Sequence, residues 1–364
     1  MSQNIRINEP IMDDAEIDAV TSVIKSGVLT SPQFEGGPEV QKLERSVREY
    51  TGARHAVAVN SGTVALQASL LALDIKPHSE VIVPSFSYVA TANAVKAVGA
   101  IPVFADILLN NYTISPDSIR NYITSRTAAI IPVHLYGLVS DIKRIREVAG
   151  HIPVIEDAAQ SLGSTIDGAH TGTMAEMGCY SLYPGKVVTA GEGGIIVTND
   201  HNMHERLLAI RNHGNVRGAF ETFGINARLP EISAAIGRIQ MGKLPMFLDI
   251  RRRNAAYLDE YLQSNTVRLP TLRQGENPNW NLYTIYTTAR DGLLSKLRQK
   301  GIGAAIYYKT PIHRTPHYSS KTSLPNTDEA SSSVLSIPVH PGVTPDDTSY
   351  MAQLINSHSS GVVC

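Results

Sequence analysis

Short, continuously apolar segments recur through the first 200 residues of this chain, and they limit the folds open to it. The segments are "HAVAVN" (55–60), "EVIVP" (80–84), "IPVFADI" (101–107), "AAIIPVH" (128–134) and "IPVIEDAA" (152–159). Helical patterns lie among them at 61–73, 88–99 and 141–150. Because the apolar segments do not alternate with polar residues, they are typical of strands buried on both faces. The sequence therefore predicts an α/β fold with a mostly parallel central sheet flanked by helices.

The later part of the chain has a different pattern. Two further strands are predicted at 179–185 and 193–200. Helices are then predicted at 201–213, 230–243 and 245–263, with Pro245 opening the last of them. A polar loop, a strand, a helix and a second strand follow at 271–281, 282–288, 293–300 and 302–308. We predict a large domain at 1–245, including an N-terminal helical segment, and a small α+β domain at 246–364.

Composition excludes several classes of protein. Hydrophobic residues make up 43% of the 364 residues and charged residues 18%, which is typical of a globular protein. The net charge of −1 gives no general attraction to nucleic acid, and no apolar run reaches the length of a membrane helix. The polar start "MSQNIRINEP" is unlike a signal peptide. Cys179 and Cys364 lack metal-ligand spacing, so we expect a cytoplasmic protein without disulfides or a metal site.

Ligands of open α/β sheets bind at the carboxyl ends of strands. We therefore expect the binding residues among the polar residues that directly follow the predicted strands. Asn60, Ser61, Gly62 and Thr63 lie where the first strand meets a helix. Such a helix N-terminus favours a phosphate, although Ser61 or Thr63 could instead simply cap the helix. No G-x-G-x-x-G follows this strand, which argues against a nicotinamide dehydrogenase.

Aromatic and acidic residues follow two other strands. Phe86 and Tyr88 offer flat rings after the second strand, and we expect one of them to pack in the core. Glu156, Asp157 and Gln160 end the run at 152–159. Adjacent acids at the end of a buried strand are costly unless they are paired, so a binding role competes with helix capping.

Lys186 lies in "YPGK", between Ser181 and a glycine cluster. A lysine on a turn is most often a solvated surface residue. Here it accompanies a phosphate cradle, an aromatic ring and a buried carboxylate, which together are what pyridoxal 5′-phosphate requires. The lysine forms a Schiff base with the aldehyde of this cofactor, and the carboxylate keeps the pyridine nitrogen protonated.

Long segments also resemble the DegT/DnrJ/EryC1/StrS family of sugar-nucleotide aminotransferases, which have the aspartate aminotransferase fold (type I). The segments include "GVLTSPQFEGGPEVQKLE" (27–44), "VIEDAAQSLG" (154–163), "YSLYPGKVVTAGEGGIIVTND" (180–200), "GINARLPEISAAIGRIQ" (224–240), "YYKTPIHRTPHY" (307–318) and "LSIPVHPGVT" (335–344). The resemblance covers nearly the whole chain.

The resemblance implies roles for individual residues. Lys186 would be the Schiff-base lysine, Asp157 would pair with the pyridinium nitrogen, and Gln160 would contact the ring-hydroxyl side. Tyr88 would stack on the ring. The phosphate would be held by Gly62, Thr63 and Ser181.

Other implied roles concern the substrate and the assembly. Tyr308 and His313 lie in the substrate-side motif of the family, although a structured loop remains an alternative for them. Asn226 would reach the cofactor phosphate of a neighbouring subunit, which implies a homodimer with shared active sites. Asn281 stands where relatives often carry histidine, so the substrate site departs from the family pattern here.

The implied activity is transfer of an amino group from an amino acid, probably glutamate by resemblance, to a nucleotide-linked keto-deoxysugar in amino-sugar biosynthesis. A lyase or a sugar dehydratase of the same fold is an alternative. Lys186 argues against the dehydratases that carry histidine at this position, and two distant cysteines cannot hold an iron–sulfur cluster. A non-catalytic regulatory homologue is a further alternative.

Overall fold

The candidate site lies on a seven-stranded sheet. The structure is a computed structural model that describes residues 4–262 and 267–359. One half has the order β3-β2-β4 and the other β5-β8-β9-β1, and isolated bridges from Ile130 to Val154 and from Val133 to Asp157 join the halves. The strands are β1 (His55–Val59), β2 (Glu80–Pro84), β3 (Ile101–Ala105), β4 (Thr127–Ile130), β5 (Ile155–Asp157), β8 (Met177–Ser181) and β9 (Gly194–Thr198).

Most neighbouring strands in this sheet are parallel, as the apolar runs predict. β2 pairs in parallel with β3 and β4, and β5 pairs in parallel with β8. β9 is antiparallel to both β8 and β1, so β1 and β8 run in the same direction. Every residue of β2, β5 and β9 is buried, which explains why their sequences do not alternate.

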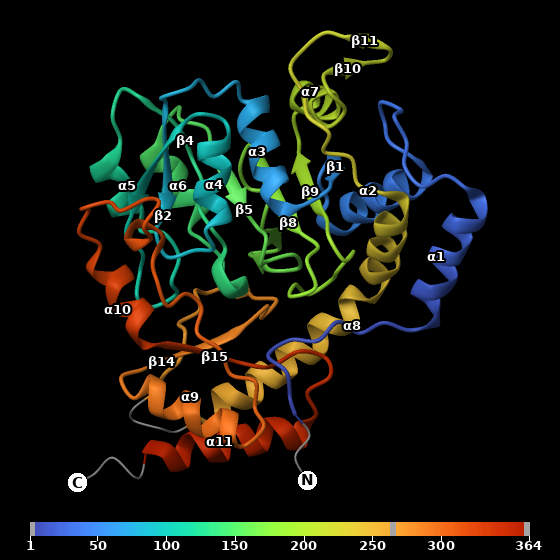
Figure 1. Ribbon diagram of the computed structural model, residues 1–364. Coiled ribbons are helices and arrows are strands. Elements are labelled where there is room, and N and C mark those ends of the chain that lie inside the picture. Colours follow the sequence, from blue (N-terminus) through green and yellow to red (C-terminus); the bar gives the residue numbers. More distant parts are fainter. Residues whose placement is uncertain (1–3, 263–266, 360–364) are drawn as a thin grey trace.

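Helices cover the sheet in Figure 1, and their ends follow local sequence signals. They are α3 (Gly62–Ala72), α4 (Ala90–Ala97), α5 (Pro116–Tyr122), α6 (Ile142–Ala149) and α7 (His201–Arg211), with α1 (Asp14–Ser26) and α2 (Pro38–Thr51) beside them. In α1, Asp13 and Glu16 form a capping box, and Gly27 ends the helix with a φ of 73°. Most of the buried residues of α3 are alanines and leucines, which matches its packing between α4, α7 and the sheet.

One long helix replaces the two helices predicted around Pro245. α8 (Glu231–Tyr261) runs through Pro245, so this proline does not open a helix. The prediction failed because packing outweighs the local cost of an internal proline: Leu244, Phe247 and Leu248 are buried on both sides of it, and α8 packs on α1 and α2. Residue 263, the predicted end, lies outside the described residues.

The C-terminal part lies at one end of α8 in Figure 1. Its antiparallel sheet has the order β12-β14-β15, and short strands elsewhere form two small sheets. The elements are β12 (Val267–Arg268), β14 (Tyr283–Thr287), α9 (Arg290–Gln299), α10 (Pro325–Ser333), β15 (Val334–Ile337) and α11 (Pro345–Ser359). One small sheet contains β6 (Thr165–Ile166), β7 (Ala169–His170) and β13 (Glu276–Asn277). The other contains β10 (Asn215–Val216) and β11 (Ala219–Phe220). β13 lies within the predicted polar loop.

The strand predicted at 302–308 is wrong. Only isolated bridges form there, from Ile302 to Ile5 and from Ala305 to Ser336. Its apolar side chains are explained by packing, since Ile302 and Ala304 are buried in the core of the C-terminal part. The predicted domain boundary at residue 245 falls inside α8, and Ile5 packs against the C-terminal core, so the division stays a prediction.

Within residues 4–262 and 267–359, no helix combines the length and apolar character needed to cross a membrane.

Candidate active site

A cavity of about 640 Å³ lies where strands of the large sheet end. Eight predicted site residues line it together: Gly62, Thr63, Tyr88, Asp157, Gln160, Ser181, Lys186 and Tyr308. The end of β5 supplies Asp157, the end of β8 supplies Ser181, and the start of α3 supplies Gly62. The cavity therefore sits at the position expected for ligands of an open α/β sheet.

Asp157 is buried, and each of its two carboxylate oxygens accepts one hydrogen bond. Thr91 Oγ1 donates to its Oδ2 at 2.8 Å, and the Ala159 N–H donates to its Oδ1 at 3.2 Å. Burial raises the pKa of Asp157, while these two hydrogen bonds and the nearby Lys186 charge oppose the rise. The bond from Ala159 is a local turn contact, because the segment after Asp157 forms turns and not the helix that the capping alternative requires. Asp157 also lines the cavity.

The adjacent Glu156 serves the opposite side of β5. Its carboxylate accepts hydrogen bonds from the N–H groups of Gly172, Met174 and Ala175, at 2.7–2.8 Å, and lies 2.8 Å from Nε2 of His134. Successive side chains of a strand point to opposite faces, so only one of two adjacent acids can face the cavity. This partnering explains how the second acid is tolerated in the core.

Lys186 follows a tight turn after β8. Its N–H donates to the Tyr183 carbonyl at 2.9 Å, and Asn8 Nδ2 donates to the Pro184 carbonyl at 3.0 Å, so both bonds fix the turn. The lysine is half-buried, and burial lowers its pKa to about 8 although Asp157 favours the charged form. A pKa in this range provides neutral amine, which is the nucleophilic form.

The start of α3 forms an anion cradle. Ser61 caps the helix by accepting a hydrogen bond from the Val64 N–H at 3.2 Å. Helix capping is the alternative role that the sequence predicts for Ser61. The N–H groups of a first helical turn have no partners within the helix, so those of Gly62 and Thr63 suit a phosphate. A Cβ at Gly62 would come within 2.9 Å of Ser181 Cβ, so glycine is what lets the helix start approach Ser181.

The two predicted aromatic residues separate as expected. Phe86 is fully buried and packs against Tyr112 and Tyr136, whereas Tyr88 is 58% exposed and lines the cavity. The Tyr88 ring lies 6.1 Å from the ring of Tyr308. Tyr88 therefore has a free face on which a planar ring could stack.

Gln160 ties two parts of the cavity wall together. Its Oε1 accepts the Tyr136 N–H at 2.8 Å, and its Nε2 donates to the Tyr308 hydroxyl at 3.0 Å. Burial raises the pKa of Tyr308, so this hydroxyl stays protonated and can donate a hydrogen bond into the cavity.

Two predicted site residues lie elsewhere. His313 is 0% exposed and outside the cavity lining; its N–H donates to Ser85 Oγ at 3.0 Å, and its Nδ1 lies 2.6 Å from the same oxygen. This position fits the structured-loop alternative. Asn226 is exposed and is not among the residues that line the cavity of its own chain; its carbonyl accepts a hydrogen bond from Asn60 Nδ2 at 3.4 Å.

The structure adds residues that sequence analysis missed. Thr91 lines the cavity and anchors Asp157, and Asn8 lines it and anchors the turn before Lys186. Tyr183 and Tyr307 also line the cavity. Thr91 lies three residues after Tyr88, on the first turn of α4, and this short spacing is a signal that could have identified it. Asn8 joins the site through the tertiary fold, since it lies 176 positions before Pro184 in the chain.

The donor set fits pyridoxal phosphate. The start of α3 and Ser181 would hold the phosphate, Tyr88 would cover the ring, and Asp157 would face the ring nitrogen. A buried carboxylate whose pKa is raised gains most from a cationic N–H partner, which a protonated pyridine provides. Lys186 would supply the amine.

Comparisons with known proteins agree with this arrangement. The model of the DegT/DnrJ/EryC1/StrS aminotransferase family matches residues 10–356. The chain is 37% identical to a UDP-N-acetyl-3-dehydro-alpha-D-glucosamine 3-aminotransferase of Acidithiobacillus ferrooxidans, over 98% of each protein. It is also 37% identical to a dTDP-3-amino-3,4,6-trideoxy-alpha-D-glucose transaminase of Streptomyces venezuelae, over 90% of this chain and 88% of the relative.

A solved structure agrees as well. The crystal structure of S. venezuelae DesV in complex with a ketimine intermediate superposes with a TM-score of 0.91 at 34% identity, over 98% of this chain and 99% of that one. Both the sequence match and the fold match extend across the two parts of the molecule. This chain belongs to the DegT/DnrJ/EryC1/StrS aminotransferase family.

Proposed function

We propose that this protein uses pyridoxal phosphate to transfer an amino group from an amino acid, glutamate in our proposal, to C3 of a nucleotide-linked keto-sugar. The observation that carries the proposal is the meeting of Lys186 and Asp157 in one cavity with a phosphate cradle. Choice of C3 is supported by relatives whose names specify 3-keto or 3-amino sugars.

The cofactor, when bound, supplies an aldehyde that condenses with amines and a ring that delocalises electrons released at an adjacent carbon. Asp157 holds a proton on the ring nitrogen, and Thr91 and Ala159 orient its carboxylate. Tyr88 and the N-terminus of α3 fix the ring and the phosphate, so that the reacting carbons meet Lys186.

Lys186 acts as the proton carrier. Its neutral amine would take the proton from Cα of the donor amino acid and pass it to the cofactor, and in the second half-reaction it would take a proton back from the cofactor and give it to C3 of the sugar. A pKa of about 8 places both forms of the amine within reach at neutral pH. Tyr308, held by Gln160, lines the space left for the substrates, and we propose it as a substrate-binding residue.

We further propose a cytoplasmic homodimer in which Asn226 reaches the partner's cofactor phosphate. Exposed apolar residues near Asn226 support this assembly: Phe220 is 76% exposed and Phe223 69% exposed. Such side chains gain from burial in an interface.

A panel experiment tests the reaction. The purified holoenzyme is incubated with glutamate and nucleotide-linked 3-keto- and 4-keto-sugars, and the products are identified by mass and NMR. Amination at C3 with release of 2-oxoglutarate is the expected result. Failure of glutamate alone to convert the bound cofactor to pyridoxamine phosphate would favour the lyase or dehydratase alternative, and lack of cofactor binding would favour the non-catalytic one.

A further inference from the structure

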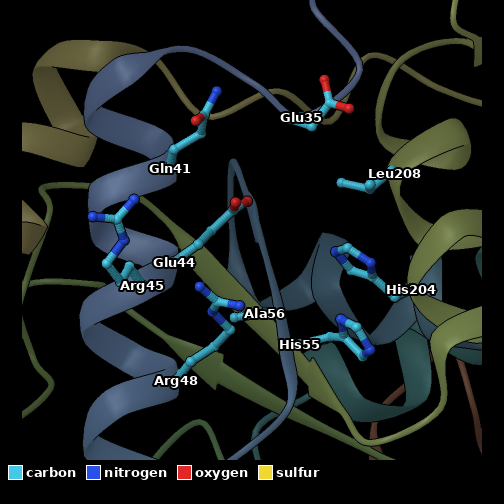
Figure 2. Close-up of a pocket in the computed structure, with 9 residues that line it drawn as sticks. All are labelled: Glu35, Gln41, Glu44, Arg45, Arg48, His55, Ala56, His204 and Leu208. Atoms are coloured by element: carbon cyan, nitrogen blue, oxygen red, sulfur yellow. The ribbon is translucent and has the colours of Figure 1, made fainter.

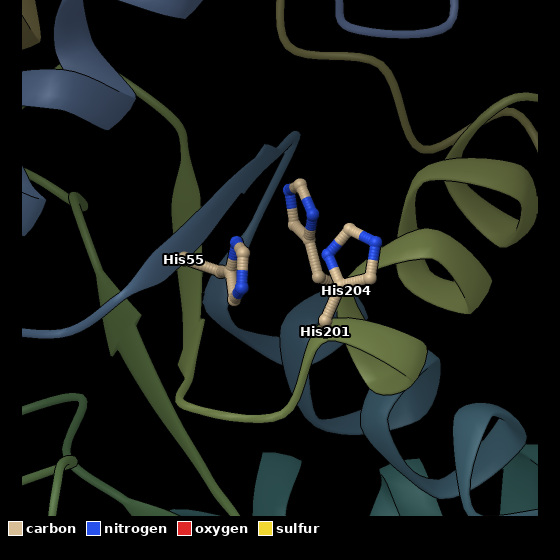
Figure 3. A group of neighbouring side chains, drawn as sticks. All are labelled: His55, His201 and His204. Atoms are coloured by element: carbon tan, nitrogen blue, oxygen red, sulfur yellow. The ribbon is translucent and has the colours of Figure 1, made fainter.

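Three histidines gather at the opposite end of β1 from the phosphate cradle. His55 begins β1, and His201 and His204 lie on the first turn of α7, three residues apart and therefore on one face of the helix. Figure 3 shows the three side chains converging between the strand and the helix. One ring nitrogen from each lies within 4.8 Å of the others. The cluster joins segments almost 150 residues apart in the chain.

The ring nitrogens of this histidine cluster are free to bind. Within residues 4–262 and 267–359, none of them takes part in a protein hydrogen bond, and Nδ1 of His204 is buried without a partner. A buried polar atom without a partner costs free energy, so a ligand there would remove a penalty. Burial also lowers the pKa of His55, and that of His204 to about 4, which keeps both rings in the neutral form that binds metals.

The three histidine rings must move slightly to share one metal ion. The rings of His55 and His204 are stacked, with centroids 4.4 Å apart and planes 17° from parallel. Nitrogens that share a tetrahedral ion at 2.0–2.1 Å are about 3.4 Å apart, so one ring must turn and the cluster must close slightly. Exposed His201 can move easily, and no hydrogen bond holds the other two rings.

A small pocket gives the ion an open side. His55 and His204 line a pocket of about 160 Å³, and Figure 2 shows them facing side chains of α2 across it. Arg211 is neutralised by Glu44 at 2.7 Å. The other charged groups around the cluster and pocket are Glu35, Arg45, Arg48, Arg54 and Asp200. They leave one excess positive charge on exposed side chains, which salt screens.

We propose that His55, His201 and His204 bind a divalent transition-metal ion, with Zn²⁺ the ion of choice, and that water from the pocket completes its coordination. Imidazole ligands suit zinc, nickel and copper, whereas magnesium prefers oxygen. The ion links β1 to α7 and does not touch the catalytic cavity. It therefore stabilises the large sheet and leaves transamination unchanged, and it is independent of the proposed reaction.

Zinc titration of the holoenzyme tests this site. The protein carries no polyhistidine tag and is freed of metal with EDTA before calorimetry. One Zn²⁺ per chain should bind with micromolar affinity or tighter and raise the melting temperature, whereas Mg²⁺ should do neither. Loss of a partner that merely supports a metal ligand costs 10–100-fold in affinity, so His201→Ala and His55→Ala should each weaken binding by at least about tenfold.

Two comparisons make the result decisive. His151→Ala removes an exposed histidine outside the cluster and should bind zinc like the wild type. Exposed His201 can be replaced without harming the fold, so weak binding by His201→Ala cannot be assigned to unfolding. The proposal is overturned by an absence of stoichiometric zinc binding, by unchanged affinity in His201→Ala, or by unchanged affinity in His55→Ala, which would mean that the helix pair binds alone.

Discussion

The hydroxyl of Thr91, on the first turn of α4, donates a hydrogen bond to the carboxylate of Asp157, at the end of β5, across 2.8 Å. Ser87 Oγ lies 3.0 Å from the same hydroxyl, and all three side chains are buried. The hydrogen bond to Asp157 favours its ionised form against the effect of burial. Thr91 is thus a positioning residue for the group that would hold the cofactor's ring nitrogen.

Replacements of Asp157, Thr91 and Ser87 should slow the half-reaction with glutamate to different degrees. A hydrogen bond to a charged group is worth about 1.5–3 kcal/mol, so Thr91→Val should slow the half-reaction with glutamate by about 10–100-fold. Asp157→Asn should slow it further because a neutral amide cannot keep the ring nitrogen protonated, while Ser87→Ala should change it least. Single-turnover absorbance of the cofactor measures all three, and wild-type rates in Asp157→Asn would contradict the assigned role.

Chemical labelling tests Lys186. The purified protein should be yellow, and borohydride should attach the cofactor to a single peptide that contains Lys186. Lys186→Ala should still bind the cofactor, because the phosphate and ring contacts remain, but should not turn over. Peptide mass spectrometry identifies the labelled lysine, and a label on any other lysine would refute the assignment.

Cofactor uptake by the apoenzyme should depend on pH through Lys186. Only the neutral amine attacks the aldehyde, so the rate should rise with pH around a midpoint near 8, not near the ordinary lysine value of 10.5. Asp157→Asn removes a charge that favours protonated Lys186, so its midpoint should move to lower pH. Stopped-flow absorbance follows the uptake; a midpoint that moves upward in this variant would contradict the electrostatic coupling.

The contact between Gly62 and Ser181 predicts a local effect of one added methyl group. Overpacking of this kind costs about 1–3 kcal/mol, so Gly62→Ala should weaken cofactor binding by roughly tenfold or more. Gly242→Ala is the control, since nothing lies within 4 Å of a Cβ there, and it should leave affinity unchanged while stabilising α8 slightly. Equal affinities in a cofactor titration would show that the helix start does not hold the phosphate.

Mixed dimers test the shared site. Asn226→Ala should weaken cofactor binding by about 10–100-fold if its side chain meets a charged phosphate. When Lys186→Ala and Asn226→Ala chains exchange subunits at limiting cofactor, each hybrid has one site with both defects and one with neither, so activity should return. If Asn226 acts within its own chain, every site keeps one defect and mixing restores nothing.

Much of the site was predictable because its residues follow strands. The carboxyl ends of parallel strands converge in space, so the sequence alone could place Asp157, Ser181 and the start of α3 together. The role of adjacent Glu156 depends on the alternation of side chains along β5, which turns it away from the cavity. Residues brought in by the tertiary fold, such as Asn8, gave no such signal.

Local rules failed where packing opposed them. The apolar run at 302–308 serves the C-terminal core without joining a strand ladder, and Pro245 is carried inside α8 by the buried residues on either side. His313 resembled a substrate residue by its motif, yet it lies against Ser85 in the interior. The histidine cluster was missed because one of its members is distant in sequence from the other two.

Pairing of β1 with β9 sets an order on biosynthesis. His55 pairs with Thr198 and Val59 with Gly194, so β1 finds its only sheet neighbour about 140 residues further along the described chain. At 5–20 residues per second, translation of that interval takes about 7–30 s. Throughout it, the nascent chain carries an apolar strand without a partner, and the phosphate cradle after it has no Ser181 to face. The hydrogen-bonding edge of this strand therefore stays unpaired during synthesis until β9 has been made, and α2, which precedes β1 in the chain, is the element available to pack on it before then.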